Sequence, residues 1–158
     1  MTQTALPPLP PVHLDGHGLK IGMVVARYNW SITGAMLALA QEELVRLGVA
    51  VEQVHVAYVP GSYELAMGVQ AMLKGEAYDG LITFGCVMKG ETRHDVIVAD
   101  AAAQGIQRVA LETGVPIILG VICANTQEQA EARIERGIEC AQAAVEMART
   151  VQVLSGKK

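Results

Sequence analysis

Short runs of apolar residues alternate four times with longer segments in which apolar positions recur at helical spacing. The short runs are rich in Val and Ile and cover residues 19–26, 51–59, 80–87 and 115–123. The longer segments cover about 32–47, 62–74, 95–113 and 126–151. In the third of these, Val98, Ala102 and Ile106 fall on one face of a helix. The pattern therefore predicts four strands, each followed by a helix.

Strands that are apolar throughout are typical of a parallel sheet that is covered on both faces. Each crossover to the next parallel strand needs a helix, and right-handed crossovers place these helices on the two faces. We therefore expect an α/β fold, a three-layer sandwich with a four-stranded parallel sheet flanked by helices, with flavodoxin-like topology.

The first residues lack this alternation and contain Leu-Pro-Pro-Leu-Pro-Pro-Val at 6–12. Proline fixes φ and has no amide donor, so this stretch is expected to be extended or polyproline II-like. We expect residues 1–18 to form a proline-rich N-terminal arm or tail, 19–152 a single domain, and 153–158 a C-terminal tail.

The composition narrows the classes of partner. Of the 158 residues, 51% are hydrophobic and only 18% are charged, which leaves little polar surface for a monomer and indicates a large subunit interface. The net charge is -4 and there is no Lys/Arg cluster, so the sequence predicts no positively charged surface that could bind nucleic acid. The N-terminus does not resemble a signal peptide, and no apolar run approaches the ~18 residues of a membrane span. We expect a cytoplasmic protein that binds neither nucleic acid nor membrane.

The three cysteines, Cys86, Cys123 and Cys140, form no CxxC pair and are odd in number. Neither a zinc site nor a complete disulfide framework is expected from them. Two of them fall in apolar, strand-like runs, and buried, small hydrophobic side chains are the favoured interpretation of the cysteines.

The carboxyl ends of the strands are where ligands collect in an open parallel sheet. The residues that follow the four strands are unusual, and they lie at 27–30, 60–64, 88–95 and 124–125. The segment 85–92 almost matches the phosphate loop of nucleotide hydrolases, but Glu91 occupies the lysine position and would oppose a triphosphate. No GxGxxG follows any strand, so a dinucleotide site is not expected either.

What remains at the third strand end is a turn that leads into a helix. The first amides and the dipole of that helix can hold a single phosphate at Gly90, Glu91 and Thr92. His94 lies in the first helical turn, where a histidine can transfer protons beside a phosphate-bearing substrate. Spacing alone leaves open that His94 is a solvated surface histidine.

Taken together, the strand ends resemble those of the lumazine synthase family, which is also known as the riboflavin synthase beta chain family. The matching segments are Arg-Tyr-Asn at 27–29, Val-Pro-Gly-Ser-Tyr-Glu at 59–64, Val-Met-Lys-Gly-Glu-Thr-Arg-His at 87–94, Gly-Val-Pro at 114–116, Glu-Gln-Ala-Glu-Ala-Arg at 128–133 and Ala-Val-Glu-Met-Ala at 144–148. They occur in order over about residues 19–148, which makes the set more specific than any one motif.

The resemblance implies a transferase that condenses 5-amino-6-(D-ribitylamino)uracil with 3,4-dihydroxy-2-butanone 4-phosphate. The product is 6,7-dimethyl-8-ribityllumazine, and the step is the penultimate one of riboflavin biosynthesis. It implies no metal and no cofactor. It also implies a homo-oligomer built on pentamers, with active sites between subunits.

The resemblance assigns His94 as the catalytic residue. Tyr28 would stack on the pyrimidine, Asn29 and Glu64 would bind ribityl hydroxyls, and Arg133 of a neighbouring subunit would hold the phosphate with the turn amides. The expected substrate-binding residues are Tyr28, Asn29, Gly61, Ser62, Tyr63, Glu64, Val87, Met88, Lys89, Gly90, Glu91, Thr92, Leu119 and Arg133.

The chain departs from the family pattern beside the histidine and on the fourth strand. An aromatic residue and then an acid usually follow the histidine, whereas this chain has Asp95 and then Val96, so Asp95 is the candidate substitute for the displaced acid. Leu119 stands where many members place a Phe from the adjacent subunit. Cys123 and Ala124 replace a usual Thr-Thr pair.

A further departure lies after the phosphate arginine, where the short connection usual in the family is missing. The sequence therefore predicts one nearly continuous helix through 126–151, with Arg136 as a replacement for the usual lysine. Because that connection lies near contacts between pentamers in the family, a pentamer is favoured over a sixty-subunit capsid.

The resemblance also concerns the N-terminal arm. In the family this arm often adds a strand to the adjacent subunit's sheet.

Three alternatives to the condensing enzyme remain. One is a non-catalytic member of the same family that binds lumazine or flavin or serves as an assembly scaffold. Another is a sister activity that consumes lumazine, as the related archaeal riboflavin synthases do. The last is a flavodoxin-like FMN binder, which fits the expected fold but not the positions of Pro60, Gly61 and Arg133.

Overall fold

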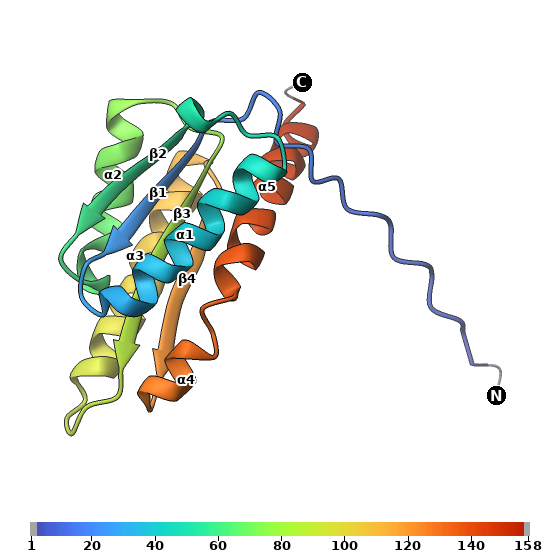
Figure 1. Ribbon diagram of the computed structural model, residues 1–158. Coiled ribbons are helices and arrows are strands. Elements are labelled where there is room, and N and C mark those ends of the chain that lie inside the picture. Colours follow the sequence, from blue (N-terminus) through green and yellow to red (C-terminus); the bar gives the residue numbers. More distant parts are fainter. Residues whose placement is uncertain (1–2, 157–158) are drawn as a thin grey trace.

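The computed structural model describes residues 3–156 and has three layers, with a central sheet between two layers of helices (Figure 1). Its elements in chain order are β1 (Ile21–Ala26), α1 (Trp30–Arg46), the 3-10 turn η1 (Val51–Gln53), β2 (Val54–Val59), the 3-10 turn η2 (Ser62–Glu64), α2 (Leu65–Gly75), β3 (Gly80–Met88), α3 (His94–Thr113), β4 (Ile117–Ala124), α4 (Gln127–Glu131) and α5 (Arg136–Leu154).

The sheet has the strand order β2-β1-β3-β4, and every pairing in it is parallel. Helices α1 and α5 cover one face, and α2 and α3 cover the other (Figure 1). The predicted α/β three-layer sandwich with flavodoxin-like topology is confirmed. Three strands start later than the pattern predicted: β1 begins at Ile21, 51–53 form the turn η1 before β2, and β4 begins at Ile117, after Pro116.

The two central strands, β1 and β3, bury both of their faces, which is why their sequences do not alternate. In β1, Met23 and Val25 pack into the core beneath α1 and α5, while Val24 and Ala26 pack beneath α2 and α3. Two hydrophobic cores therefore hold the central strands from opposite sides and fix the end of the sheet at which the loops gather.

The prediction of one nearly continuous helix over 126–151 is wrong. Thr126 caps the short helix α4 by accepting a hydrogen bond from the Gln129 amide at 3.2 Å. Four residues in a turn, 132–135, separate α4 from α5. The change of direction lets Ala130 and Gly137 both lie buried. Gly137 packs so closely on α1 that a Cβ there would lie 2.5 Å from the Met36 carbonyl oxygen, and a straight helix would not bring it there.

The cysteines divide between the core and the surface. Cys86 and Cys140 are buried, as their apolar surroundings predicted, whereas Cys123 is exposed. The prediction for Cys123 is wrong because β4 is an edge strand, which within the described residues has a neighbouring strand on one side only and leaves this side chain exposed.

Within the described residues, the hydrogen bonds that hold the arm to the rest of the chain lie at its base. Residues 3–15 form no helix or strand and extend away from the body of the molecule (Figure 1). At the base, Arg149 of α5 donates hydrogen bonds to the carbonyl oxygens of Asp15 at 2.9 Å and His17 at 2.7 Å. Residues 1–2 of the predicted arm and 157–158 of the predicted tail lie outside the described residues, and α5 itself runs to Leu154. In the described part of the chain, no helix has the length and apolar character needed to span a membrane.

Candidate active site

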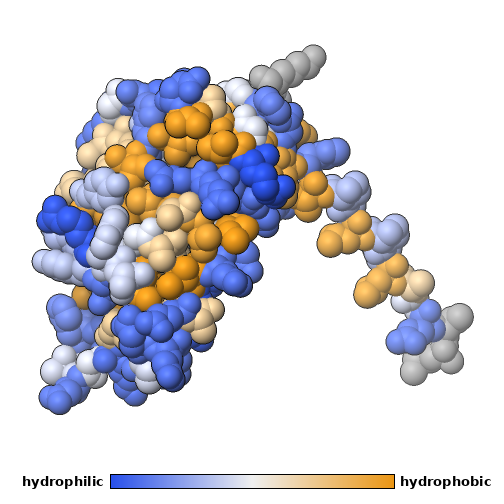
Figure 2. Space-filling view, viewed as in Figure 1, coloured by the Kyte–Doolittle hydropathy of each residue, from blue (hydrophilic) through white to orange (hydrophobic). Residues whose placement is uncertain are grey.

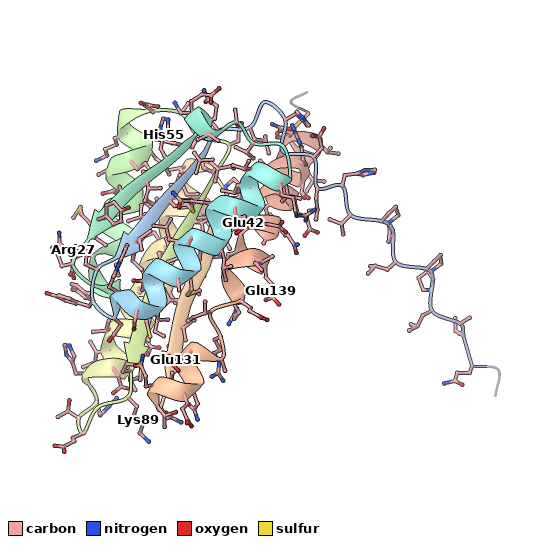
Figure 3. The ribbon with its side chains drawn as sticks, in the orientation of Figure 1. Arg27, Glu42, His55, Lys89, Glu131 and Glu139 are labelled. Carbon is pink, nitrogen blue, oxygen red and sulfur yellow. The ribbon has the colours of Figure 1, made fainter. Side chains whose placement is uncertain are left out.

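A cavity of about 710 Å³ lies at the carboxyl ends of β1 and β3, between the turn η2 and the start of α3. It lies at the end of the sheet that the topology predicts for a ligand site. Arg27 and Lys89, which directly follow β1 and β3, mark this end of the sheet in Figure 3. The cavity is lined by Tyr28, Asn29, Gly61, Ser62, Tyr63, Glu64, Cys86, Val87, Met88, Gly90, Thr92, His94, Asp95, Ile97 and Val98.

The turn after β1 is held in a fixed shape. Asn29 has a left-handed backbone with φ of 61°, a conformation that asparagine tolerates better than most residues. Its side-chain amide donates a 2.8 Å hydrogen bond to the carbonyl oxygen of Cys86 on β3. With the amide nitrogen so engaged, the side-chain oxygen of Asn29 remains as an acceptor for a ligand hydroxyl.

Tyr28 packs on the loop that follows β2. Its backbone amide donates to the Pro60 carbonyl oxygen at 2.9 Å, and its ring packs on Gly61, where a Cβ would lie 2.7 Å from the ring. The ring itself is largely exposed to the cavity and solvent. An aromatic face in this position is available to stack on a planar heterocycle.

The turn η2 supplies a carboxylate that is also part of the backbone structure. One oxygen of Glu64 accepts a 3.0 Å hydrogen bond from the Gly61 amide, which leaves its other oxygen for a ligand hydroxyl. Ser62 is buried against β3, and a Cβ on Gly85 would lie 2.3 Å from the Ser62 hydroxyl oxygen. Gly85 therefore allows η2 to approach β3 closely and so to form the cavity wall.

The turn between β3 and α3 leaves room for an anion. The Lys89 amide donates to the Ala124 carbonyl oxygen at 2.9 Å, which fixes the start of the turn on β4. Nothing lies within 4 Å of the place where a Cβ of Gly90 would be. The turn then enters α3, a helix of 20 residues whose first amides carry partial positive charge.

His94 is the first residue of α3 and lines the cavity. Its backbone amide donates to the Thr92 hydroxyl at 3.3 Å, so the side chain of Thr92 stabilises the start of the helix. Among residues 3–156, no hydrogen bond or ion pair engages the imidazole ring, and the ring is exposed. The ring is thus free to exchange protons with a ligand in the cavity.

Asp95 does not orient that imidazole in this structure. It lines the cavity and is half-buried, but no hydrogen bond joins its carboxylate to His94 within the described part of the chain. Its charge acts instead on Cys123 of β4, where burial and then the carboxylates of Asp95 and Asp100 raise the pKa of the thiol.

Four of the sequence-predicted site residues, Lys89, Glu91, Leu119 and Arg133, do not line the cavity. Leu119 is exposed on the edge strand β4, and Arg133 is exposed in the turn between α4 and α5. The Arg133 guanidinium donates to the Gln129 carbonyl oxygen at 2.9 Å. Both residues lie on the β4 side of the fold, so neither completes the cavity of its own chain.

The predicted substrate-binding set missed Cys86, Ile97 and Val98 in the cavity wall, and Asp95, which also lines it, was predicted only as the acid beside the histidine. Helical spacing points to two of them, because positions three and four residues after His94 share its face of the helix. Val98 had been assigned to the apolar stripe that packs on the sheet. Burial is the first cause that raises the pKa of the Cys86 thiol, which keeps it protonated and unreactive at neutral pH.

Within the described residues, no group of three or more His, Cys, Asp or Glu side chains lies close enough together to hold a metal ion.

Comparison with known proteins gives one consistent family. The family model described as 6,7-dimethyl-8-ribityllumazine synthase matches residues 18–152. Curated proteins of that name are similar along most of their length. The one from Azoarcus sp. is 42% identical over 89% of this chain and 91% of its own, and the one from Cupriavidus necator is 43% identical over 91% and 87%. A third, from Acidovorax sp., is 43% identical over 90% and 93%.

Proposed function

Because this chain belongs to the 6,7-dimethyl-8-ribityllumazine synthase family, we propose that it is a transferase that forms 6,7-dimethyl-8-ribityllumazine in riboflavin biosynthesis. The substrates are 5-amino-6-(D-ribitylamino)uracil and 3,4-dihydroxy-2-butanone 4-phosphate. The observation that carries the proposal is the cavity, in which a free imidazole, an open anion turn and a stacking ring are brought together.

In this proposal, different residues of the cavity bind the two substrates. The ring of Tyr28 stacks on the pyrimidine, and the side-chain oxygens of Asn29 and Glu64 accept hydrogen bonds from ribityl hydroxyls. The amides at the start of α3 hold the phosphate of the second substrate. This arrangement places the amine of one substrate beside the ketone of the other, and such positioning alone removes much of the barrier.

The chemistry needs protons to move at each step. The amine attacks the ketone and an imine forms with loss of water; phosphate then leaves by elimination. The enol that remains tautomerises to a new ketone, and the ribitylamine nitrogen closes the ring on this carbonyl with loss of a second water. His94 is the group placed to take up and return these protons. In this proposal the reaction uses proton transfer and positioning, and it requires neither a metal nor a cofactor.

We propose in addition that the active sites lie between subunits of a cytoplasmic homo-oligomer built on pentamers. Leu119 and Arg133 support this proposal, since both are exposed on the β4 side and outside the cavity of their own chain. In an oligomer, the Arg133 of one subunit supplies a guanidinium for the phosphate at the turn of the next.

Turnover by the purified protein tests the proposal. Given both substrates, the protein should release fluorescent lumazine and phosphate faster than the uncatalysed mixture. The His94→Ala variant should lower kcat by about 10²-fold or more, the usual contribution of a positioned acid–base group. His13→Ala is the matched control, because His13 lies in the exposed arm, and its rate should equal that of the wild type. Lumazine formation no faster than in buffer would reject the proposal.

One observation favours a second candidate, a non-catalytic member that binds lumazine or flavin. This is the missing hydrogen bond between Asp95 and His94 in the described chain. Tight binding of lumazine without turnover of the two substrates would support this candidate over the enzyme.

A further inference from the structure

The guanidinium of Arg133 is held by a backbone carbonyl that a continuous helix would have used for itself. In an α-helix, the amide of residue 133 donates to the carbonyl oxygen of residue 129. Here the Arg133 amide donates to the Ala130 carbonyl oxygen at 3.0 Å, because the chain tightens in the turn at 132–135. Among the described residues, no backbone amide then reaches the Gln129 carbonyl oxygen. The Arg133 guanidinium takes that place and donates to it at 2.9 Å.

Gln129 is at the same time tied to the end of β4. Its side-chain oxygen accepts a 2.8 Å hydrogen bond from the Asn125 amide. Its own backbone amide donates to the Thr126 hydroxyl at 3.2 Å. The next residue, Ala130, is fully buried in the core, which fixes α4 on the sheet. The carbonyl that holds Arg133 therefore has a fixed position relative to β4.

Most of the hydrogen-bonding capacity of Arg133 remains for a ligand. A guanidinium has five N–H donors, and within residues 3–156 only the bond to Gln129 engages them. No carboxylate in that range forms an ion pair with Arg133. Figure 2 shows a hydrophilic surface over α4. Glu131 of α4 and Lys89, which begins the turn between β3 and α3, lie at the same end of the molecule (Figure 3).

We propose that Gln129 is a positioning residue, which orients the Arg133 guanidinium toward the phosphate of 3,4-dihydroxy-2-butanone 4-phosphate in the neighbouring subunit's site. A guanidinium binds two phosphate oxygens together only when its plane has the right orientation. A long side chain loses rotamer freedom when it binds, and a prior bond to a fixed carbonyl reduces that cost. The bond between the Gln129 side chain and the Asn125 amide keeps the carbonyl in place.

This inference rests on the proposed function, in which Arg133 binds the phosphate. It concerns affinity for phosphate, which can be measured without turnover. An active enzyme in which Gln129 has no effect on phosphate would refute only the positioning role. A protein that makes no lumazine would refute the proposed enzyme and would leave phosphate binding to be measured by itself.

Initial rates give the first readout. Gln129→Ala removes the bond between this side chain and the backbone after β4 and leaves Arg133 in place. We expect KM for the phosphate-bearing substrate to rise about threefold to tenfold, the value of one net hydrogen bond. KM for the ribitylaminouracil and kcat should stay nearly unchanged, because only binding of the phosphate is weakened.

Gln127→Ala is the matched control for this substitution. Gln127 lies on the same short helix, and its side-chain amide reaches its two partners only at 3.5 and 3.4 Å. Both KM values of this control should equal those of the wild type. A rise in KM for both substrates in Gln129→Ala would show general damage to the site and would contradict a role in positioning the arginine.

Binding of inorganic phosphate separates positioning from a structural role. The dissociation constant is measured by phosphorus NMR titration of the purified full-length protein, for the wild type, Gln129→Ala, Arg133→Ala and the double variant. Positioning predicts that Gln129→Ala weakens binding about threefold to tenfold when Arg133 is present. It predicts no further loss when Arg133 is absent, so the double variant should bind as Arg133→Ala does.

Three results of this titration would overturn the proposal. An equal effect of Gln129→Ala in both backgrounds would show that Gln129 acts on the fold and not through the arginine. Unchanged affinity in Gln129→Ala would show that the guanidinium needs no such support. Unchanged affinity in Arg133→Ala would show that the guanidinium binds no phosphate, which leaves Gln129 nothing to position.

Discussion

At the scale of single residues, close packing and burial around the cavity limit which groups can take part in chemistry. Cys86 lines the cavity, but burial raises the pKa of its thiol, and Asn29 and Glu64 each commit one side-chain group to the backbone. The imidazole of His94 has no such commitment among the described residues. His94 is thus a cavity group that stays free to move protons.

Cys140 gives a prediction about stability in alkaline solution. Burial in the core raises the pKa of its thiol from 9.0 to about 11. A raised thiol pKa stabilises the fold fully below the unfolded value near 9, and this stabilisation is lost as the pH rises toward about 11. The expected loss is about 2–3 kcal/mol, from about 1.4 kcal/mol per unit of pKa.

Urea unfolding at pH 8 to 11 would measure this loss, with the wild type compared with Cys140→Ala. Removing the thiol lowers stability at every pH, but the decline between pH 9 and 11 should be shallower in the variant. Parallel curves for the two proteins would show that Cys140 does not ionise differently in the folded and unfolded chains.

At the scale of elements, the alternation of apolar runs predicts the four strands and the helices that follow them, because each strand is a short apolar run and each helix carries an apolar stripe. The break between α4 and α5 was not predictable in the same way. Helix propensity and apolar spacing continue through 132–135, and the change of direction there accompanies the close approach of Gly137 to the backbone of Met36. That contact joins residues far apart in the sequence.

The same contact yields a prediction for Gly137→Ala. An added Cβ would lie 2.5 Å from the Met36 carbonyl oxygen, so α5 must shift away from α1. We expect the free energy of unfolding to fall by about 1–3 kcal/mol, the usual cost of overpacking a core. The measurement is urea unfolding at neutral pH.

Gly75→Ala is the matched control for this substitution. Gly75 ends α2, no heavy atom lies within 4 Å of a Cβ built there, and its φ is not positive. Alanine at this position should leave stability unchanged or raise it slightly. If Gly137→Ala were as stable as this control, the close packing of α5 on α1 would not be required.

At the scale of the whole molecule, the sequence located most of the cavity because the carboxyl ends of parallel strands meet at one end of the sheet. The sequence could not show which of the predicted site residues lie outside the cavity of their own chain. Arg133 and Leu119 lie on the β4 side, and this follows from the strand order, which places β4 at the far edge from β2. Nor did the motif around His94 show that Asp95 makes no hydrogen bond with the imidazole in the described chain, since a side-chain direction depends on packing.

The placement of Arg133 leads to a test of the shared site by complementation. We expect His94→Ala and Arg133→Ala to be nearly inactive when each is prepared alone, the second because the phosphate loses its guanidinium. If His94 and Arg133 of one site come from different subunits, random co-assembly of equal amounts recreates intact sites. An intact site needs His94 from one variant and Arg133 from the other, each with a chance of one half, so about one quarter of the wild-type activity should return. Co-expression of differently tagged chains and tandem purification would supply the mixed oligomers. Lumazine formation that stays at the level of the separate variants would place His94 and Arg133 in the same subunit's site, or would remove Arg133 from the site altogether.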